Sequence, residues 1–158
     1  MALTNRERIG RMLEVLAAGL RPIAEQAQIP MTSLAAYIKI IEGSEWVFKT
    51  AQNDRVVIER IVEDMAAKGY QRIALARDAS GYGEGVAELF TELGEPEGIE
   101  VVTVESFAPD ATDFTAQMVN IRNTQPDAVV IWGIPSAASL AQVAYRQLGL
   151  EAPVYQSH

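Results

Sequence analysis

From residue 53 onward, short apolar runs alternate with segments of helical periodicity, and this alternation limits the fold more than any other feature. The expected strands are residues 72–76, 99–104, 128–133 and 153–157, and the expected helices are residues 53–68, 82–93, 113–124 and 136–150. Strands that alternate with helices predict βαβ units and a parallel sheet. The strands are apolar throughout, which indicates helices on both faces of that sheet. The fold class is therefore α/β, a parallel sheet flanked by helices.

The N-terminal part of the chain follows no such regular order. Apolar residues recur at helical spacing over residues 5–20, and we expect a helix there that Pro22 ends. A short helical segment, residues 22–28, then precedes a buried strand within residues 29–36 and a second short strand over residues 46–50. The regular alternation therefore begins only at residue 53.

Charge and composition exclude several classes of function. The chain has 13 basic and 21 acidic residues, a net charge of −8, and no basic cluster of the kind that binds nucleic acid. It has no cysteine, and its single histidine is His158, which excludes thiolate catalysis, disulfides and histidine-based triads or metal sites. No group of Asp and Glu has the spacing of an EF-hand. We expect no cofactor and no metal.

No apolar run approaches the roughly 18 residues that span a membrane. The first 22 residues also lack the pattern of a secretory signal, because Glu14 interrupts their apolar stretch and no cleavage site with small residues follows. Taken alone, the N-terminus predicts the cytoplasm.

Three alternating glycines occupy the turn between the strand at 72–76 and the next helix. This segment, residues 79–85 (ASGYGEG), is called the glycine loop below. A dinucleotide fingerprint requires a third glycine where Val86 stands, and no Gly-Lys-Ser/Thr follows as in a P-loop. Asp78 and Glu84 flank the N-terminus of the helix that follows and would oppose a phosphate there. The glycines themselves are explained by a tight turn, since glycine tolerates positive φ.

A turn does not explain Tyr82, an aromatic residue inside the glycine loop. The loop follows the carboxyl end of a strand, where open α/β sheets bind their ligands. Tyr82 is therefore a candidate wall for a small ligand. The alternative is that its ring packs on the neighbouring loop.

Other candidate residues favour structural roles. Asp78 could act as an acid or base, but no second catalytic group accompanies it, and we favour a loop-capping role. Ser33, Ser136 and Ser139 are not in the G-x-S-x-G elbow of hydrolases. Trp132 also ends a strand, and such a residue belongs more often to the core than to a ligand site. An enzyme is therefore not expected.

Five segments together carry a family resemblance: IPMTSLAA, WVFKTAQND, GYQRIALARDASGYGEG, FTAQMVNIRNTQPDAVVIWG and AYRQLGLEAPVYQSH. The chain resembles the type I periplasmic solute-binding proteins of ABC importers, in particular the branched-chain amino acid (Leu/Ile/Val) binding group. The resemblance implies two Rossmann-like lobes, a hinge and a ligand cleft. By it, residues 1–20 are a helix of unclear origin, 21–52 a remnant of the first lobe and the hinge crossover, and 53–158 the front part of the second lobe. The chain then looks like a truncated member.

The resemblance also implies a set of ligand-binding residues. They are Ser33, Ala35, Tyr37, Tyr82, Ile134 and His158. Tyr37 stands where the family has a small hydroxyl residue, and Ile134 stands where some members have an aromatic residue. His158 stands where the amino-acid binders have an acid. These departures widen the expected ligands from branched-chain amino acids to related small carboxylates or amides.

The implied function is the substrate-binding component of an ABC-type importer, with a small-molecule ligand, a permease partner and a periplasmic location. The last point conflicts with the cytoplasmic location that the N-terminus predicts. A fragment of this kind is expected to bind weakly or not at all, because a cleft needs both walls. Two alternatives stay open: a ligand-sensing domain of a receptor or regulator, and a non-binding fragment that forms homodimers through its uncovered faces.

Overall fold

The computed structural model describes residues 19–34 and 40–157, which divide into two compact units between Asn53 and Asp54. In the first unit, residues 19–27 are helical and precede two parallel strands, β1 (Met31–Ser33) and β2 (Val47–Lys49). Both predicted strands are confirmed in their described parts. The prediction that Pro22 ends a helix is wrong, because residues on both sides of it are helical. Proline removes only its own N–H donor and crowds one earlier carbonyl, so a helix can continue beyond it.

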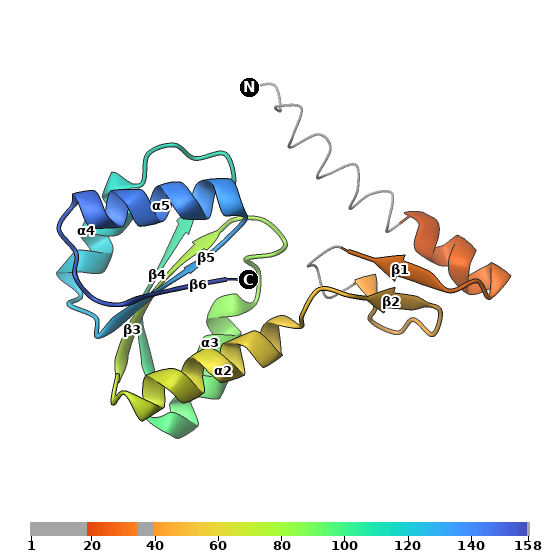
Figure 1. The fold of residues 1–158 in the computed structure, drawn as a ribbon, viewed down its shortest axis with the longest axis horizontal. Helices are drawn as coiled ribbons and strands as arrows, with labels where there is room; N and C mark the ends of the chain where they lie inside the picture. Colours follow the sequence, from red (N-terminus) through yellow and green to blue (C-terminus); the bar gives the residue numbers. More distant parts are fainter. Residues whose placement is uncertain (1–18, 35–39, 158) are drawn as a thin grey trace. The chain divides into compact units, whose positions relative to one another are not determined.

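The second unit is built on a four-stranded, fully parallel sheet (Figure 1). Its strands are β3 (Arg72–Asp78), β4 (Glu100–Phe107), β5 (Ala128–Trp132) and β6 (Val154–Gln156). Their order in the sheet is β4-β3-β5-β6, so β3 and β5 are central. The predicted α/β class with a parallel sheet is confirmed.

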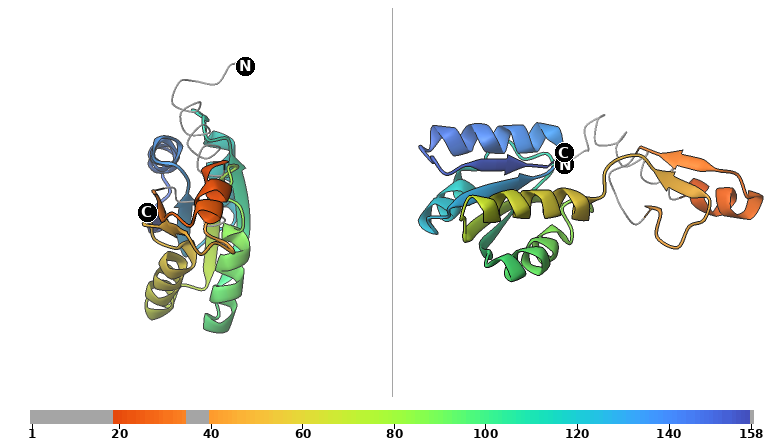
Figure 2. Two further views of the ribbon diagram at one scale, coloured as in Figure 1. Left: turned by 90° about the vertical axis from the view of Figure 1, so that its right-hand side faces the viewer. Right: turned by 60° about the horizontal axis from the view of Figure 1, so that its bottom comes forward.

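Helices cover both faces of this sheet. They are α2 (Asp54–Ala67), α3 (Val86–Gly94), the short 3₁₀ helix η2 (Glu95–Glu97), α4 (Thr115–Asn123) and α5 (Pro135–Gln147). The sheet lies between α4 and α5 on one side and α2 and α3 on the other (Figure 1; Figure 2). Successive residues of β3 serve the two faces in turn, since side chains alternate along a strand. Ile73 and Leu75 join the core under α2 and α3, whereas Ala74 and Ala76 join the core under α4 and α5.

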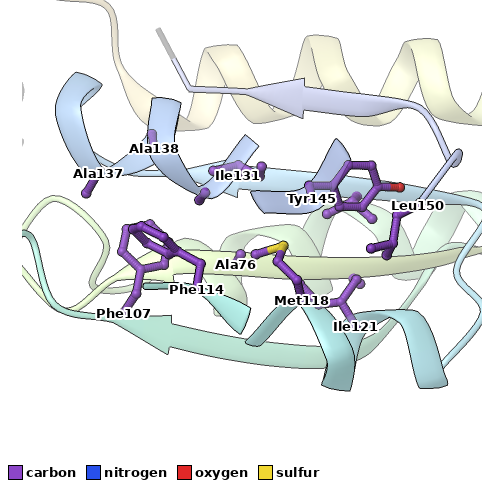
Figure 3. Close-up of a cluster of buried hydrophobic side chains, with 13 residues drawn as sticks. Ala76, Phe107, Phe114, Met118, Ile121, Ile131, Ala137, Ala138, Tyr145 and Leu150 are labelled. Carbon is purple, nitrogen blue, oxygen red and sulfur yellow. The ribbon is translucent and has the colours of Figure 1, made fainter. Parts of the chain in front are cut away.

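The core under α4 and α5 is shown in Figure 3. The rings of Phe107 and Phe114 meet edge to face at one end, with centroids 5.2 Å apart. Tyr145 of α5 lies near the other end and is fully buried, and its hydroxyl donates to the carbonyl of Ala152 at 2.8 Å. A buried phenol needs such a partner, because an unsatisfied hydroxyl is costly to bury.

The edge strand β4 differs from the central strand β5 in burial. All five residues of β5 are buried, as the apolar pattern predicts. In β4 only Phe107 is buried, because this strand lies at the edge of the described sheet and has a neighbour on one side only. Uniform burial of all strands is therefore not observed.

At the amino end of the sheet, Asp127 links the starts of β3 and β5. Its Oδ2 accepts hydrogen bonds from the backbone N–H groups of Gln71 and Arg72, at 2.8 and 2.9 Å. These two donors lower the pKa of the Asp127 carboxyl below its ordinary value of 3.8. Relative to the protonated form, the carboxylate form of Asp127 is therefore more stable in the folded chain than in the unfolded one.

We expect Asp127 to make stability depend on pH. Because its pKa is lower in the folded state, its contribution is complete above pH 3.8 and is lost as the pH falls through the folded-state pKa. The variant Asp127→Asn lacks this titration, so its deficit in unfolding free energy relative to wild type should shrink as the pH falls from 6 toward 3. Urea unfolding at several pH values measures the deficit. A deficit that stays constant or grows toward low pH would contradict this role, and Glu97→Gln in exposed η2 is the control.

Candidate ligand-binding site

The carboxyl ends of β3, β5 and β6 lie next to one another, because these parallel strands are neighbours in the sheet. This edge, where the strands end at Asp78, Trp132 and Gln156, is called the carboxyl edge below. The segments that follow carry Tyr82, Ile134 and Ser157. Ligands of open α/β sheets bind in this position.

The glycine loop is a series of turns, and α3 begins only at Val86. The predicted helix start at Tyr82 is therefore wrong by four residues. The reason is local: Gly85 has φ +75°, a left-handed conformation that cannot continue a right-handed helix. Tyr82 thus sits in the turn rather than in the helix.

The ring of Tyr82 is half-buried and lies against Trp132, with centroids 5.7 Å apart and planes tilted by 33°. Burial raises the pKa of Tyr82 to about 12. A side-chain hydrogen bond with Ser157 opposes the rise, and the charges of Asp54 and Asp78 add to it. The phenol is therefore protonated at neutral pH, and it is hydrogen-bonded to Ser157. Its ring packs on strand β5 and is not fully covered.

Trp132 packs against the ring of Tyr82 from the core of the second unit. It is fully buried, and its ring also meets Phe90 of α3 edge to face, with centroids 6.2 Å apart. The prediction that Trp132 belongs to the core is confirmed. Trp132 is thus a core residue at the carboxyl edge and not an exposed ligand contact.

Asp78 ends β3 and is fully buried. Its Oδ1 accepts hydrogen bonds from the N–H of Ser80 at 3.0 Å and from the Ser80 hydroxyl at 2.5 Å. The predicted loop-capping role of Asp78 is confirmed. Its second oxygen, Oδ2, accepts from the backbone N–H of Ile134 at 3.0 Å, which the sequence does not reveal.

Ile134 follows β5 and forms the N-cap of α5. Its side chain is 37% exposed, so an apolar group is left at the surface beside the end of the central strand. The structure thus brings two of the predicted site residues, Tyr82 and Ile134, to the same carboxyl edge. Both are anchored to the end of the sheet through Asp78 or Trp132.

Ser157 is a further polar group at this edge, and the sequence reasoning missed it. Its hydroxyl donates to the carbonyl of Gly133 at 3.1 Å and lies 3.3 Å from the N–H of Gly133 as an acceptor. With its hydrogen bond to Tyr82, Ser157 links the end of β6 to both neighbouring loops. The available signal was its place at the carboxyl end of the last expected strand, residues 153–157.

The remaining predicted site residues are placed differently. Ser33 ends β1 in the first unit, where it is buried and its carbonyl accepts from the N–H of Thr50 at 3.1 Å. Ala35, Tyr37 and His158 lie outside the described residues. Their predicted roles stay predictions.

No helix within residues 19–34 and 40–157 is long and apolar enough to cross a membrane. The same ranges contain no group of three or more acidic or histidine side chains arranged to hold a metal ion.

Comparison with known proteins identifies the family. The sequence profile described as "Periplasmic binding protein" matches residues 9–157, nearly the whole chain. A Leu/Ile/Val-binding protein homologue of Brucella melitensis is 26% identical over 116 residues, which are 71% of this chain and 31% of that protein.

Solved structures have the same fold. An extracellular ligand-binding receptor from Rhodopseudomonas palustris HaA2 superposes with a TM-score of 0.81 and 29% identity, covering 90% of this chain and 40% of that one. A solute-binding protein of an ABC transporter from R. palustris, solved with 4-hydroxybenzoate, gives a TM-score of 0.78 at 24% identity, with 89% and 40% covered. The chain thus spans only about a third to two fifths of the length of these relatives. By the match over residues 9–157, the chain belongs to the periplasmic binding protein family.

Proposed function

We propose that this chain is part of the substrate-binding component of an ABC-type importer for amino acids or related small carboxylates or amides, and that it acts by binding and not by catalysis. The family match over residues 9–157 carries this proposal. The ligand class is supported by two relatives, one named for Leu, Ile and Val and one solved with 4-hydroxybenzoate. All of these ligands join a carboxylate to an apolar body.

The carboxyl edge of the second unit suits such a ligand. Tyr82 offers a partly exposed aromatic ring with a neutral phenol, and Ile134 offers an exposed aliphatic side chain. An apolar wall with a few placed hydrogen-bonding groups is the usual lining of a small-molecule site. Ser33, Ala35, Tyr37 and His158 would add the groups that meet the polar end of the ligand.

We further propose that residues 21–52 are the remnant of the first lobe with the hinge crossover, and that residues 53–158 are the front part of the second lobe. The division of the structure between Asn53 and Asp54 supports this boundary. In a complete protein the two lobes would close on the ligand, which couples binding to a shift between open and closed states. The complete protein would act in the periplasm and deliver its ligand to a membrane permease.

The chain alone should bind weakly, because most of a small ligand's surface must be buried for tight binding and one wall cannot bury it. We expect dissociation constants weaker than about 0.1 mM, the range in which ligand-observed NMR still detects saturable binding. Saturation-transfer measurements with L-leucine and 4-hydroxybenzoate on the 158-residue chain test the proposal. A saturable transfer signal from at least one of these two carboxylates is the expected result. No transfer from either ligand, or tight binding of an unrelated compound class, would overturn it.

Tyr82→Ala should remove most of this weak binding. Loss of one aromatic contact should weaken it by about 5- to 10-fold, since such contacts contribute roughly 1 kcal/mol and 1.4 kcal/mol is tenfold. Tyr70→Ala is the matched control, because Tyr70 is also half-buried but precedes β3 at the opposite end of the sheet. The same titration on both variants measures the effect, and equal losses would show that Tyr82 has no particular part in binding.

A further inference from the structure

Asp78 has an unusual position for a charged group. It ends the central strand β3, is fully buried, and divides its two oxygens between two loops. Oδ1 accepts hydrogen bonds from the N–H and the hydroxyl of Ser80 in the glycine loop. Oδ2 accepts from the N–H of Ile134 at the start of α5, 56 residues away in sequence. A buried carboxylate is tolerated when hydrogen bonds satisfy it, and bonds to a charged acceptor are stronger than neutral ones.

The hydrogen bonds continue from Asp78 to Tyr82. The hydroxyl of Ser80, which donates to Asp78 Oδ1, lies 3.2 Å from the backbone N–H of Tyr82 and accepts from it. A short path therefore runs from the backbone of Tyr82 through Ser80 and Asp78 to the backbone of Ile134. The backbone N–H groups of both candidate wall residues are thus connected to this single carboxylate.

Two glycines make room for the carboxylate, one on each side. A Cβ at Gly83 would lie 2.8 Å from Asp78 Oδ1, and a Cβ at Gly133 would lie 3.2 Å from Oδ2. The first distance is too short for any real side chain, and the second is tight. The glycine loop and the Trp132-Gly133 pair therefore fit closely around the same group. Neither loop can shift far without breaking a contact to Asp78.

We propose that Asp78 is a positioning residue, which holds Tyr82 and Ile134 at a set separation before a ligand arrives. What these two walls contact rests on the proposed function above, whereas their coupling through Asp78 does not. A wall ordered in advance loses less entropy on binding, which raises both affinity and selectivity for ligands of one shape. The carboxyl edge would then act as a rigid binding surface, and Asp78 would fix the separation of Tyr82 and Ile134 on it.

Asp78→Asn tests the coupling with almost no change in size. Asparagine has one acceptor oxygen, so it cannot accept from both Ser80 and Ile134, and its NH₂ group must face one of their donors. We expect the backbone N–H of Ser80, Tyr82 or Ile134 to exchange with solvent roughly 10- to 100-fold faster. Core amides of β5, such as those of Val130 and Ile131, should keep their wild-type rates. Amide hydrogen exchange followed by NMR on the 158-residue chain measures all of these positions.

Asp127→Asn is the matched control. Asp127 also accepts from two backbone N–H groups at a strand end, but through one oxygen, which asparagine retains. In the Asp127→Asn variant, the amide exchange rates at the carboxyl edge should equal those of the wild-type chain. Unchanged exchange at Ser80, Tyr82 and Ile134 in Asp78→Asn would overturn the proposal. A uniform rise that includes the β5 amides would also overturn it, since Asp78 would then only stabilise the fold.

A second variant decides the question if Asp78→Asn does not fold. Ser80→Ala removes the link to Tyr82 and leaves the bond between Asp78 and Ile134. The N–H of Tyr82 should then exchange faster while that of Ile134 stays protected. Fast exchange of Ile134 in the wild-type chain, or unchanged exchange of Tyr82 in Ser80→Ala, would overturn the proposal. No ligand is used, so a failure to bind L-leucine or 4-hydroxybenzoate leaves this test unaffected.

Discussion

Replacing Trp132 by alanine is expected to lower the free energy of unfolding by about 3–5 kcal/mol, the range for removing a large buried aromatic side chain. Trp132 is fully buried at the end of the central strand β5, where Tyr82 and Phe90 pack against it from two directions. Alanine would leave a cavity that these rings cannot fill without moving. Because Tyr82 rests on Trp132, the same change should also release the glycine loop.

Urea unfolding followed by circular dichroism measures the loss for Trp132→Ala. Leu140→Ala on α5 is the control, since that side chain is 44% exposed and its removal should cost less than about 1 kcal/mol. A loss for Trp132→Ala no larger than that for Leu140→Ala would contradict the position of the tryptophan in the core.

Gly83→Ala should destabilise the second unit by about 3 kcal/mol or more, at the upper end of the cost of forcing atoms into a packed site. A Cβ at this position would lie 2.1 Å from the carbonyl oxygen of Asp78 and 2.8 Å from its Oδ1. The carbonyl belongs to the backbone at the end of β3 and cannot turn aside as a flexible side chain could. The chain must then move the glycine loop or break the contacts of Asp78.

Gly85→Ala, two residues along the same loop, separates this steric effect from backbone strain. Gly85 has φ +75°, but a Cβ there meets nothing within 4 Å. Its replacement should therefore cost only about 1–2 kcal/mol, the penalty for a left-handed conformation. Unfolding free energies of the two variants give the comparison. Equal losses would mean that the space beside Asp78 is not what requires glycine at position 83.

Most of the sheet could be predicted because its signals are local. The apolar runs that became β3 and β5 are short and buried on both sides, and the helices between them have clear periodicity. The start of α3 was harder to predict. The pattern of apolar residues continues back to Tyr82, whereas the left-handed Gly85 sets the actual boundary at Val86.

The residues of the candidate site differ in the same way, since some have a local signal in the sequence and others do not. Tyr82 could be singled out because an aromatic residue in a turn after a strand is a local signal. The bond between Asp78 and Ile134 joins residues 56 positions apart, and the part played by Ser157 depends on β6 pairing with β5. Such contacts exist only once the sheet has assembled, so no pattern along the chain indicates them. What local reasoning could say of Asp78 was that it caps a turn, which is half of its observed role.

The carboxyl edge of the second unit is proposed to be a ligand-binding wall. The most direct test is a titration of the ¹⁵N-labelled chain with L-leucine and with 4-hydroxybenzoate, followed residue by residue in NMR spectra. We expect saturable shifts that gather at Tyr82, Ile134 and Ser157, whereas the signals of Gln71 and Asp127, at the amino end of the sheet, should stay unchanged. Shifts gathered at the amino end, or no saturable shift at the carboxyl edge with either ligand, would contradict it.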